Sequence, residues 1–228
     1  MYLTLSYRAL RKVTAPIRRW WSRRTFNAQN YWLERHNAPL GIRSVANTGL
    51  SEQENELEYA EALEQLANYL KEDFAGFARL QVLDLGCGQG HYAKLADSLH
   101  VAAYTGLDFA SPHLARLAQR YPRFVFVKAD ITENHPVFTR KHDAVLLIDT
   151  VYHITNDAKF RQLLRNIRRC VSVGSVIYIT SNFEDSEPHR HMRNRSLNWF
   201  SSLTELGEVR GPAKWRGNSM IRVYVDSA

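Results

Sequence analysis

The chain has 228 residues, of which 45% are hydrophobic, and a net charge of +7; this length and composition suit one globular domain with a large core. Its two cysteines, Cys87 and Cys170, exclude a framework of structural disulfides and favour a reducing cytoplasm. The sequence has no run of about 18 apolar residues and no apolar signal core, so we expect neither a membrane span nor secretion.

Residues 1–24 carry the whole net charge. This segment holds seven basic residues and no acidic one, while the remainder has 23 of each. Its apolar residues recur every three or four positions around Pro16, which predicts a kinked, basic amphipathic helix. Such a helix suits the surface of an anionic membrane and would attach the protein peripherally to the inner face. Packing over the protein's own cleft or in a dimer contact is the alternative, and no pattern assigns an oligomeric state.

A short helix with two large aromatic side chains, Tyr31 and Trp32, is predicted over residues 30–36. We expect residues 1–50 to form a basic amphipathic extension and lid, in which this aromatic pair contacts the substrate. Anchoring of the lid in the core is the alternative. A capping-box pattern at residues 51–54 then predicts the start of a long helix.

Residues 82–90 are the most informative segment and read Val-Leu-Asp-Leu-Gly-Cys-Gly-Gln-Gly. The apolar residues suit a strand that is buried on both faces of a parallel sheet. Asp84 offers a carboxylate near the carboxyl end of this strand, where open α/β sheets bind ligands. The glycines allow a sharp turn and a close approach of the backbone to a ligand. We interpret Cys87 as a small residue that fills tight space rather than as a reactive thiol.

The glycine spacing separates this segment from two other ligand loops. A dinucleotide-binding G-x-G-x-x-G pattern would need glycine where His91 stands, and the phosphate-loop pattern is absent. Residues 84–90 resemble the first motif of class I S-adenosylmethionine (SAM) dependent methyltransferases. The resemblance implies an α/β fold with a doubly wound, mostly parallel seven-stranded sheet of Rossmann-like type. It also implies SAM as the cofactor, S-adenosylhomocysteine (SAH) as the product, and a methyltransferase domain over residues 51–228.

A second strand is predicted over residues 103–107. It ends at Asp108, which follows Asp84 by 24 positions, near the spacing of a ribose-binding acid in such folds. Ser111 and Pro112 then form a typical N-cap and first-turn pair, which predicts a helix from this point to about residue 121.

Two more predicted strands, at residues 124–128 and 144–148, are each followed by an aspartate. The resemblance places Asp130 at the adenine amino group and Ile131 against the adenine ring. Asp149 is expected to shape the cofactor pocket rather than to remove a proton. A solvated turn at a strand end is the alternative for any one aspartate.

The remaining pattern predicts a helix from about residue 158, a strand at 175–180, a helix at 197–206 and a final strand pair ending near 225. Such alternation is typical of a doubly wound α/β domain, and the resemblance covers residues 51–181. It implies that the cofactor is bound mainly from the loops at the strand ends. The residues concerned are Asp84, Gly86, Cys87, Gly88, Gly90, Asp108, Phe109, Asp130, Ile131 and Asp149.

His153 is the leading candidate for a catalytic base. It lies just beyond the fourth predicted strand, beside the methyl position that the resemblance implies, and histidine titrates near neutral pH. A packing or orienting role is the alternative. Its neighbour Tyr152 is expected to contact the substrate.

The segment at residues 182–195 follows the fifth predicted strand, where the resemblance places substrate-binding elements. Arg190 and Arg193 could hold a phosphate or carboxylate of an anionic acceptor, and His189 or His191 could serve as the base. The alternative is a solvated loop whose charges pair internally. No metal is expected, because no carboxylate or third histidine has suitable spacing.

Residues 148–153 lack the Asn/Asp-Pro-Pro-aromatic signature of enzymes that methylate the amino groups of bases. We therefore expect a small polar acceptor, such as a sugar or a phosphorylated or lipid-linked intermediate, methylated on oxygen or, as the less favoured alternative, on nitrogen. One alternative is an RNA methyltransferase whose basic N-terminus holds phosphates, although nucleic acid is the less favoured partner. Another is a SAM-binding interaction module without catalysis.

Overall fold

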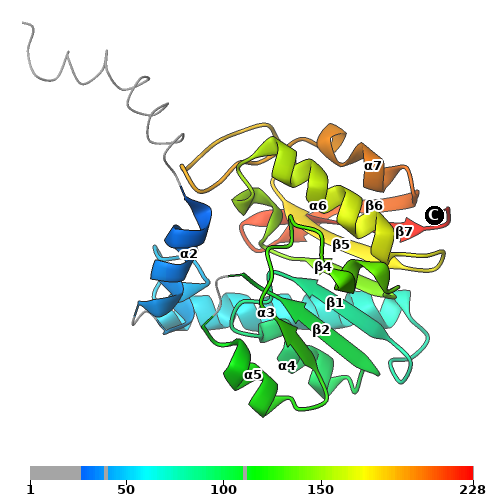
Figure 1. Ribbon diagram of the computed structural model, residues 1–228, viewed down its shortest axis with the longest axis horizontal. Coiled ribbons are helices and arrows are strands. Elements are labelled where there is room, and N and C mark those ends of the chain that lie inside the picture. The colour runs from blue at the N-terminus through cyan, green and yellow to red at the C-terminus, as the bar shows by residue number, and fades with distance from the viewer. Residues whose placement is uncertain (1–26, 39–40, 110–111, 228) are drawn as a thin grey trace, which may run out of the picture.

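The computed structural model describes residues 27–38, 41–109 and 112–227 (Figure 1). The basic helix predicted for residues 1–24 lies outside this part of the chain. Within it, no helix is long and apolar enough to cross a membrane. The boundary near residue 50 between an extension and a methyltransferase domain stays a prediction.

A seven-stranded sheet with the order β3-β2-β1-β4-β5-β7-β6 forms the centre of the fold. The first five strands pair in parallel, and β7 is antiparallel to both β5 and β6. This arrangement confirms the predicted doubly wound, mostly parallel sheet. The strands are β1 (Gln81–Leu85), β2 (Ala103–Leu107), β3 (Val125–Val127), β4 (Ala144–Leu147), β5 (Val176–Ser181), β6 (Gly207–Trp215) and β7 (Asn218–Val225).

Helices connect and cover these strands. The α-helices of the described residues are α2 (Ala28–Asn37), α3 (Glu52–Asp73), α4 (His91–Ser98), α5 (Leu114–Arg120), α6 (Asp157–Cys170) and α7 (Ser201–Thr204). The short 3-10 helices are η1 (Gly41–Ser44), η2 (Pro136–Thr139), η3 (Val151–His153) and η4 (Leu197–Phe200).

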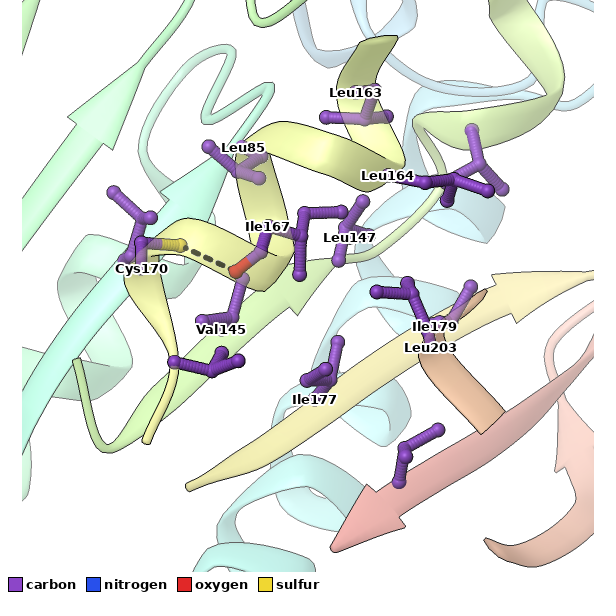
Figure 2. Close-up of a cluster of buried hydrophobic side chains, with 14 of the residues drawn as sticks. Leu85, Val145, Leu147, Leu163, Leu164, Ile167, Cys170, Ile177, Ile179 and Leu203 are labelled. Carbon is purple, nitrogen blue, oxygen red and sulfur yellow. Dashed lines mark hydrogen bonds between the residues drawn. The ribbon is translucent and has the colours of Figure 1, made fainter. Parts of the chain in front are cut away.

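Helices α6 and α7 lie over one face of the sheet, and Figure 2 shows the apolar side chains packed between them. Leu163 and Ile167 of α6 and Ile177 of β5 have 0% of their surface exposed. A second cluster, which includes Leu66, fills the space between the other face and α3, α4 and α5. Because helices cover both faces, the central strands β4 and β5 are buried along their whole length.

Side-chain caps fix the starts of two helices, and the sequence predicted one of these caps. The capping box is confirmed, because Glu54 N–H donates to Ser51 Oγ at 3.2 Å and Ser51 N–H donates to the Glu54 carboxylate at 2.8 Å. Helix α6 begins after Asn156, whose side chain accepts the N–H of Lys159 at 3.0 Å. These bonds satisfy N–H groups that the first turn leaves without helical partners.

Two predicted helices differ in detail. The helix expected to start at Ser111 and Pro112 begins at Leu114 instead, after His113 as N-cap; residue 111 lies outside the described part. The first bond of the helical ladder runs from Leu117 N–H to the His113 carbonyl, at 2.9 Å, and Pro112 and His113 lie in a turn. The helix expected at 197–206 is split into η4 and the short α7.

Candidate active site

A cavity of about 550 Å³ lies at the carboxyl ends of the parallel strands. Its walls come from the loops after β1, β2, β3 and β4, from the segment around η3, and from helices α2 and α3. The chain reverses its direction of winding between β1 and β4, which is where open α/β sheets bind ligands. The volume is within the range of about 300 to 1,000 Å³ that is usual for small-molecule sites.

The glycine loop after β1 forms one wall and is anchored to the neighbouring strand. The N–H groups of Gly86 and Cys87 both donate to the Leu107 carbonyl, at 2.8 and 3.0 Å. Gly86 has a φ of +93°, and a Cβ at this position would lie 2.5 Å from Thr150 Oγ1. Only glycine therefore allows the loop to turn this tightly against the end of β4.

Two carboxylates, at the ends of β2 and β3, also line the cavity. Asp108 accepts the N–H of Gly88 at 3.0 Å, so the glycine loop and the acid hold each other. Asp130 accepts from Thr132 Oγ1 at 2.6 Å and from Lys159 Nζ at 2.8 Å. Burial alone would raise the pKa of Asp130, but the bonds from Lys159 and Thr132 hold it below its ordinary value.

Asp84 and Gly90 do not line the cavity, although we expected both to bind the cofactor. The Asp84 carboxyl group is buried beneath the loop and accepts a hydrogen bond from the Tyr104 hydroxyl. Burial raises the pKa of Asp84 to about 7, and the Tyr104 bond opposes that change. Gly90, with a φ of +81°, is the N-cap of α4. Both residues support the loop from the side away from the cavity.

Asp149, after β4, lines the cavity and has a left-handed backbone with φ of +55°. Its N–H donates to Thr180 Oγ1 at 2.7 Å, and its carboxylate accepts from the Tyr152 hydroxyl at 3.1 Å. Arg216 Nη1 donates to the same carboxylate at 2.8 Å, from the turn between β6 and β7. Tyr152 thus contacts Asp149 and does not itself line the cavity.

His153 lies in the cavity wall beside Trp32 of α2, with ring centroids 4.5 Å apart. Its Nδ1 lies 3.1 Å from the His191 carbonyl oxygen; because a carbonyl only accepts, Nδ1 carries the proton and Nε2 is the acceptor. We expected this imidazole to titrate near neutral pH, but burial lowers the pKa of His153 to about 3. The ring is therefore neutral at physiological pH.

Tyr31, His189 and His191 form a second layer outside this wall. The Tyr31 and His191 rings stack at 4.7 Å, and the His189 and His191 rings at 5.5 Å. Burial, followed by the charge of His189, lowers the pKa of His191 to about 4. None of the three residues lines the cavity. They connect α2 to the segment at residues 182–195.

The two arginines expected to hold an anionic acceptor do not line the cavity either. Arg193 pairs with Asp157 at 3.0 Å and with Glu187 at 3.8 Å. Arg190 is exposed. The alternative interpretation, internal pairing of the charges in this loop, therefore describes Arg193. Buried Arg195, which also pairs with Asp157 at 2.9 Å, strengthens this network.

A protein family described as a methyltransferase domain matches residues 82–174. This span begins in β1, includes the glycine loop and the carboxylates of the cavity, and ends before β5. The chain carries a class I SAM-dependent methyltransferase domain.

Solved structures with the same methyltransferase fold are similar in sequence only at a low level. N-methyltransferase NodS from Bradyrhizobium japonicum WM9, in complex with SAH, has 16% identity and a TM-score of 0.65, over 88% of this chain and 99% of that one. The 1,6-didemethyltoxoflavin-N1-methyltransferase of Burkholderia thailandensis has 17% identity and a TM-score of 0.58, over 89% and 92%. The sugar N-methyltransferase KedS8 from Streptoalloteichus sp ATCC 53650 has 14% identity and a TM-score of 0.57, over 75% and 88%. No curated protein matches.

The cavity of this methyltransferase fits SAM. The glycine loop leaves room that a Cβ would fill, and carboxylates follow β2 and β3 where hydroxyl and amino groups need acceptors. Of the residues expected to bind the cofactor or substrate or to act in catalysis, the cavity brings ten together. They are Trp32, Gly86, Cys87, Gly88, Asp108, Phe109, Asp130, Ile131, Asp149 and His153.

Several residues of the methyltransferase site were missed by sequence reasoning. Tyr59 of α3 stacks on His91 at 4.0 Å, and both line the cavity. Burial, together with the charges of Arg216 and Lys94, lowers the pKa of His91 to about 4. The Tyr92 hydroxyl is buried at the cavity with no partner among the described residues. Only His91 had a sequence signal, its position directly after the glycine loop.

Proposed function

We propose that this methyltransferase transfers the methyl group of SAM to a nitrogen atom of a small molecule bound in the cavity. In this proposal Gly86, Cys87 and Gly88 approach the cofactor with their backbone. Asp108 and Phe109 lie at its ribose, and Asp130 and Ile131 at its adenine. The remaining wall, formed by Trp32, Tyr59, His91, Asp149 and His153, faces the acceptor and the transferred methyl group.

The observation that carries the choice of nitrogen is the protonation state of His153. SAM supplies a methyl group that is already activated on a sulfonium, so an uncharged amine needs only alignment and exclusion of water. A hydroxyl acceptor would also need a base, and a histidine with a pKa of about 3 is a weak one. Asp149, the nearby carboxylate, is held by Arg216. Neutral His153 can instead accept a hydrogen bond from an acceptor N–H through Nε2.

The charges of the wall support an acceptor without an anionic group. Among the described residues, Lys159 is the one lysine or arginine that lines the cavity, and it pairs with Asp130 at 2.8 Å. Among the described residues assigned to the acceptor side, Asp149 is the acid and pairs with Arg216 at 2.8 Å, so this part of the wall offers no lysine or arginine to a phosphate or carboxylate. This proposal replaces the anionic acceptor and the oxygen atom that the sequence alone favoured.

The compared structures support the same choice. NodS, KedS8 and the toxoflavin enzyme are each named as N-methyltransferases, and KedS8 as one that acts on sugars. A small amino compound, such as an amino sugar, is therefore the acceptor class that we propose.

The test uses pairs of small molecules that differ only in an amino or a hydroxyl group, such as an amino sugar and its parent sugar. Calorimetry with SAH first checks the cofactor site, and Asp108→Ala should weaken SAH binding at least 10-fold. Mass spectrometry should then detect methylation of the amino member of a pair. Methylation of only the hydroxyl member, or of RNA in place of small molecules, would contradict the proposal.

A further inference from the structure

Arg216 lies in the turn between β6 and β7, beyond the span that the family matches, yet its side chain reaches the back of the cavity wall. Only 12% of the side chain is exposed. Nη1 donates to Asp149 Oδ2 at 2.8 Å, and Nη2 donates to Glu58 Oε2 at 3.0 Å. The guanidinium lies 4.3 Å from the centroid of the Tyr59 ring. One side chain thus connects α3, the end of β4 and the C-terminal hairpin.

Two of the three groups that Arg216 contacts are part of the cavity wall. Asp149 and Tyr59 line the cavity, whereas Arg216 and Glu58 stand behind them. Asp149 needs external support because its φ of +55° is rare for a residue with a side chain. The planar guanidinium can bond two carboxylates and stack on a ring at once, which a lysine ammonium cannot do.

The charge of Arg216 also acts on the wall. Tyr59 stacks on His91 with the ring planes 14° apart, so the contacts of Arg216 lead directly to this imidazole. Burial is the main reason that the pKa of His91 is low, and the charge of Arg216 comes second, followed by Lys94. The His91 ring therefore reports on the charge behind the wall.

We propose that Arg216 is a positioning residue for methyl transfer, because it holds the Asp149 carboxylate and the Tyr59 ring in the wall against which the acceptor aligns. This inference rests on the proposed function for its effect on turnover. The effect of Arg216 on the cavity wall can be measured in the protein without cofactor or acceptor.

Arg222 provides a matched control on the same hairpin. Its side chain is 13% exposed, and it pairs with Asp73 at 2.8 Å and Glu72 at 3.1 Å, both from α3. Its guanidinium lies 4.1 Å from the centroid of the Tyr69 ring. Arg222 therefore repeats the chemistry of Arg216 at a place that does not border the cavity. Loss of either arginine removes an ion pair to α3, which is Glu58 for Arg216 and Asp73 with Glu72 for Arg222.

The experiment compares Arg216→Met, Arg216→Lys and Arg222→Met in the full chain. We expect Arg216→Met to lower kcat by about 10-fold to 100-fold, since small misplacements have effects of this size. The kcat of Arg222→Met should stay within about 2-fold of the wild-type value, even if this variant unfolds more easily. NMR titration of the protein without ligands should show a higher pKa for His91 in Arg216→Met, and no change in Arg216→Lys, which keeps the charge.

An unchanged His91 titration in Arg216→Met would overturn the proposal, and so would equal losses of kcat in Arg216→Met and Arg222→Met. Failure of the proposed function looks different. In that case the wild-type protein would not bind SAH or methylate an amine. The His91 titration would still differ between Arg216→Met and Arg222→Met.

Discussion

Asp84 lies inside β1 with 1% of its surface exposed, beneath the loop that forms one wall of the cavity. Side chains alternate between the two faces along a strand, so a residue within β1 points into the helical layer. Here the Asp84 carboxyl group meets the Tyr104 hydroxyl. Aspartates that follow a strand, such as Asp108 and Asp130, instead reach the cavity. In the register of the sheet, Asp108 lies two residues and Asp130 four residues beyond the position of Asp84, and this difference separates a lining acid from a supporting one.

Asp84→Asn tests this supporting role through the pH dependence of stability. The pKa of Asp84 in the folded protein is about 7, above its ordinary value of 3.8. Between these pH values the folded protein binds a proton that the unfolded chain has released, so the free energy of unfolding falls as pH rises. Asparagine cannot ionise, so the variant should gain stability relative to wild type from pH 4 to pH 8, by on the order of a few kcal/mol.

Urea unfolding at several pH values measures this difference. Asp143→Asn is the control, because Asp143 is a half-buried acid whose carboxylate accepts the N–H of Gln81 at the start of β1, away from the loop. A stability difference between Asp84→Asn and wild type that stays constant with pH would show that the Asp84 carboxyl group is already ionised.

Sequence reasoning located His153 but not its chemistry. The position follows from the strand pattern, since the residue comes just after β4. Its low pKa, however, depends on burial among packed neighbours such as Trp32, and the bond from Nδ1 to the His191 carbonyl opposes that change. Those contacts come from segments far away in the chain, so no local pattern could have predicted a neutral imidazole.

Helix α2 forms part of the cavity wall. Figure 1 shows this helix beside the carboxyl ends of the strands. Its Trp32 lines the cavity, and its Tyr31 stacks on the loop that carries His191. The helix was predicted from the sequence, as was the aromatic pair. The sequence did not predict which of the two rings faces the cavity, because neighbouring residues point in different directions on a helix.

Trp32→Ala is expected to open this part of the wall. Loss of the indole exposes His153 to water, which reduces the desolvation that lowers its pKa. The pKa of His153 should therefore rise toward its ordinary value of 6.5 from about 3, and turnover should fall by about 10-fold as water enters the site. NMR titration and methylation assays measure the two effects.

Leu33→Ala is the matched control, because Leu33 is the next residue of α2 and is 45% exposed. It should leave both the His153 titration and turnover close to wild type. If the His153 titration in Trp32→Ala is the same as in wild type, α2 does not control access to the site.

Elements with a strong local signal were predicted closely, and those set by distant contacts were not. The capping box of α3 is confirmed because both of its bonds form within four residues. The β6–β7 hairpin was expected only as a final strand pair. Its turn residue Arg216 could not be connected to Asp149, because the two are 67 positions apart and no periodicity relates them.

The arrangement of the whole sheet follows from its connections. Parallel strands joined by helices bring their carboxyl ends to one edge, so the loops after β1, β2, β3 and β4 had to meet. The core on both faces holds these ends in place, as Figure 2 shows for the side of α6. This is why a cavity lined by residues between 86 and 149 could be predicted from the strand ends, with the resemblance to methyltransferases supplying the cofactor, while the acceptor wall could not.

The charge of the protein is divided between two parts of the chain. Residues 1–24 hold seven basic residues and no acid, and the rest is formally neutral, with 23 residues of each sign. The three-and-four-residue spacing of apolar residues in this segment motivates the prediction that it binds an anionic membrane surface, with about 1 kcal/mol from each basic residue near the surface.

Deletion of residues 1–24 tests that prediction. The full chain should sediment with vesicles that contain phosphatidylglycerol, and less so as salt is added, because salt screens the attraction. The shortened chain should stay in solution, and neither chain should bind vesicles of phosphatidylcholine alone. SAH affinity should be equal in the two chains. The deletion could instead weaken SAH binding while the full chain binds no vesicles. In that case the segment covers the cleft of its own enzyme, and its arginines act on the site rather than on a membrane.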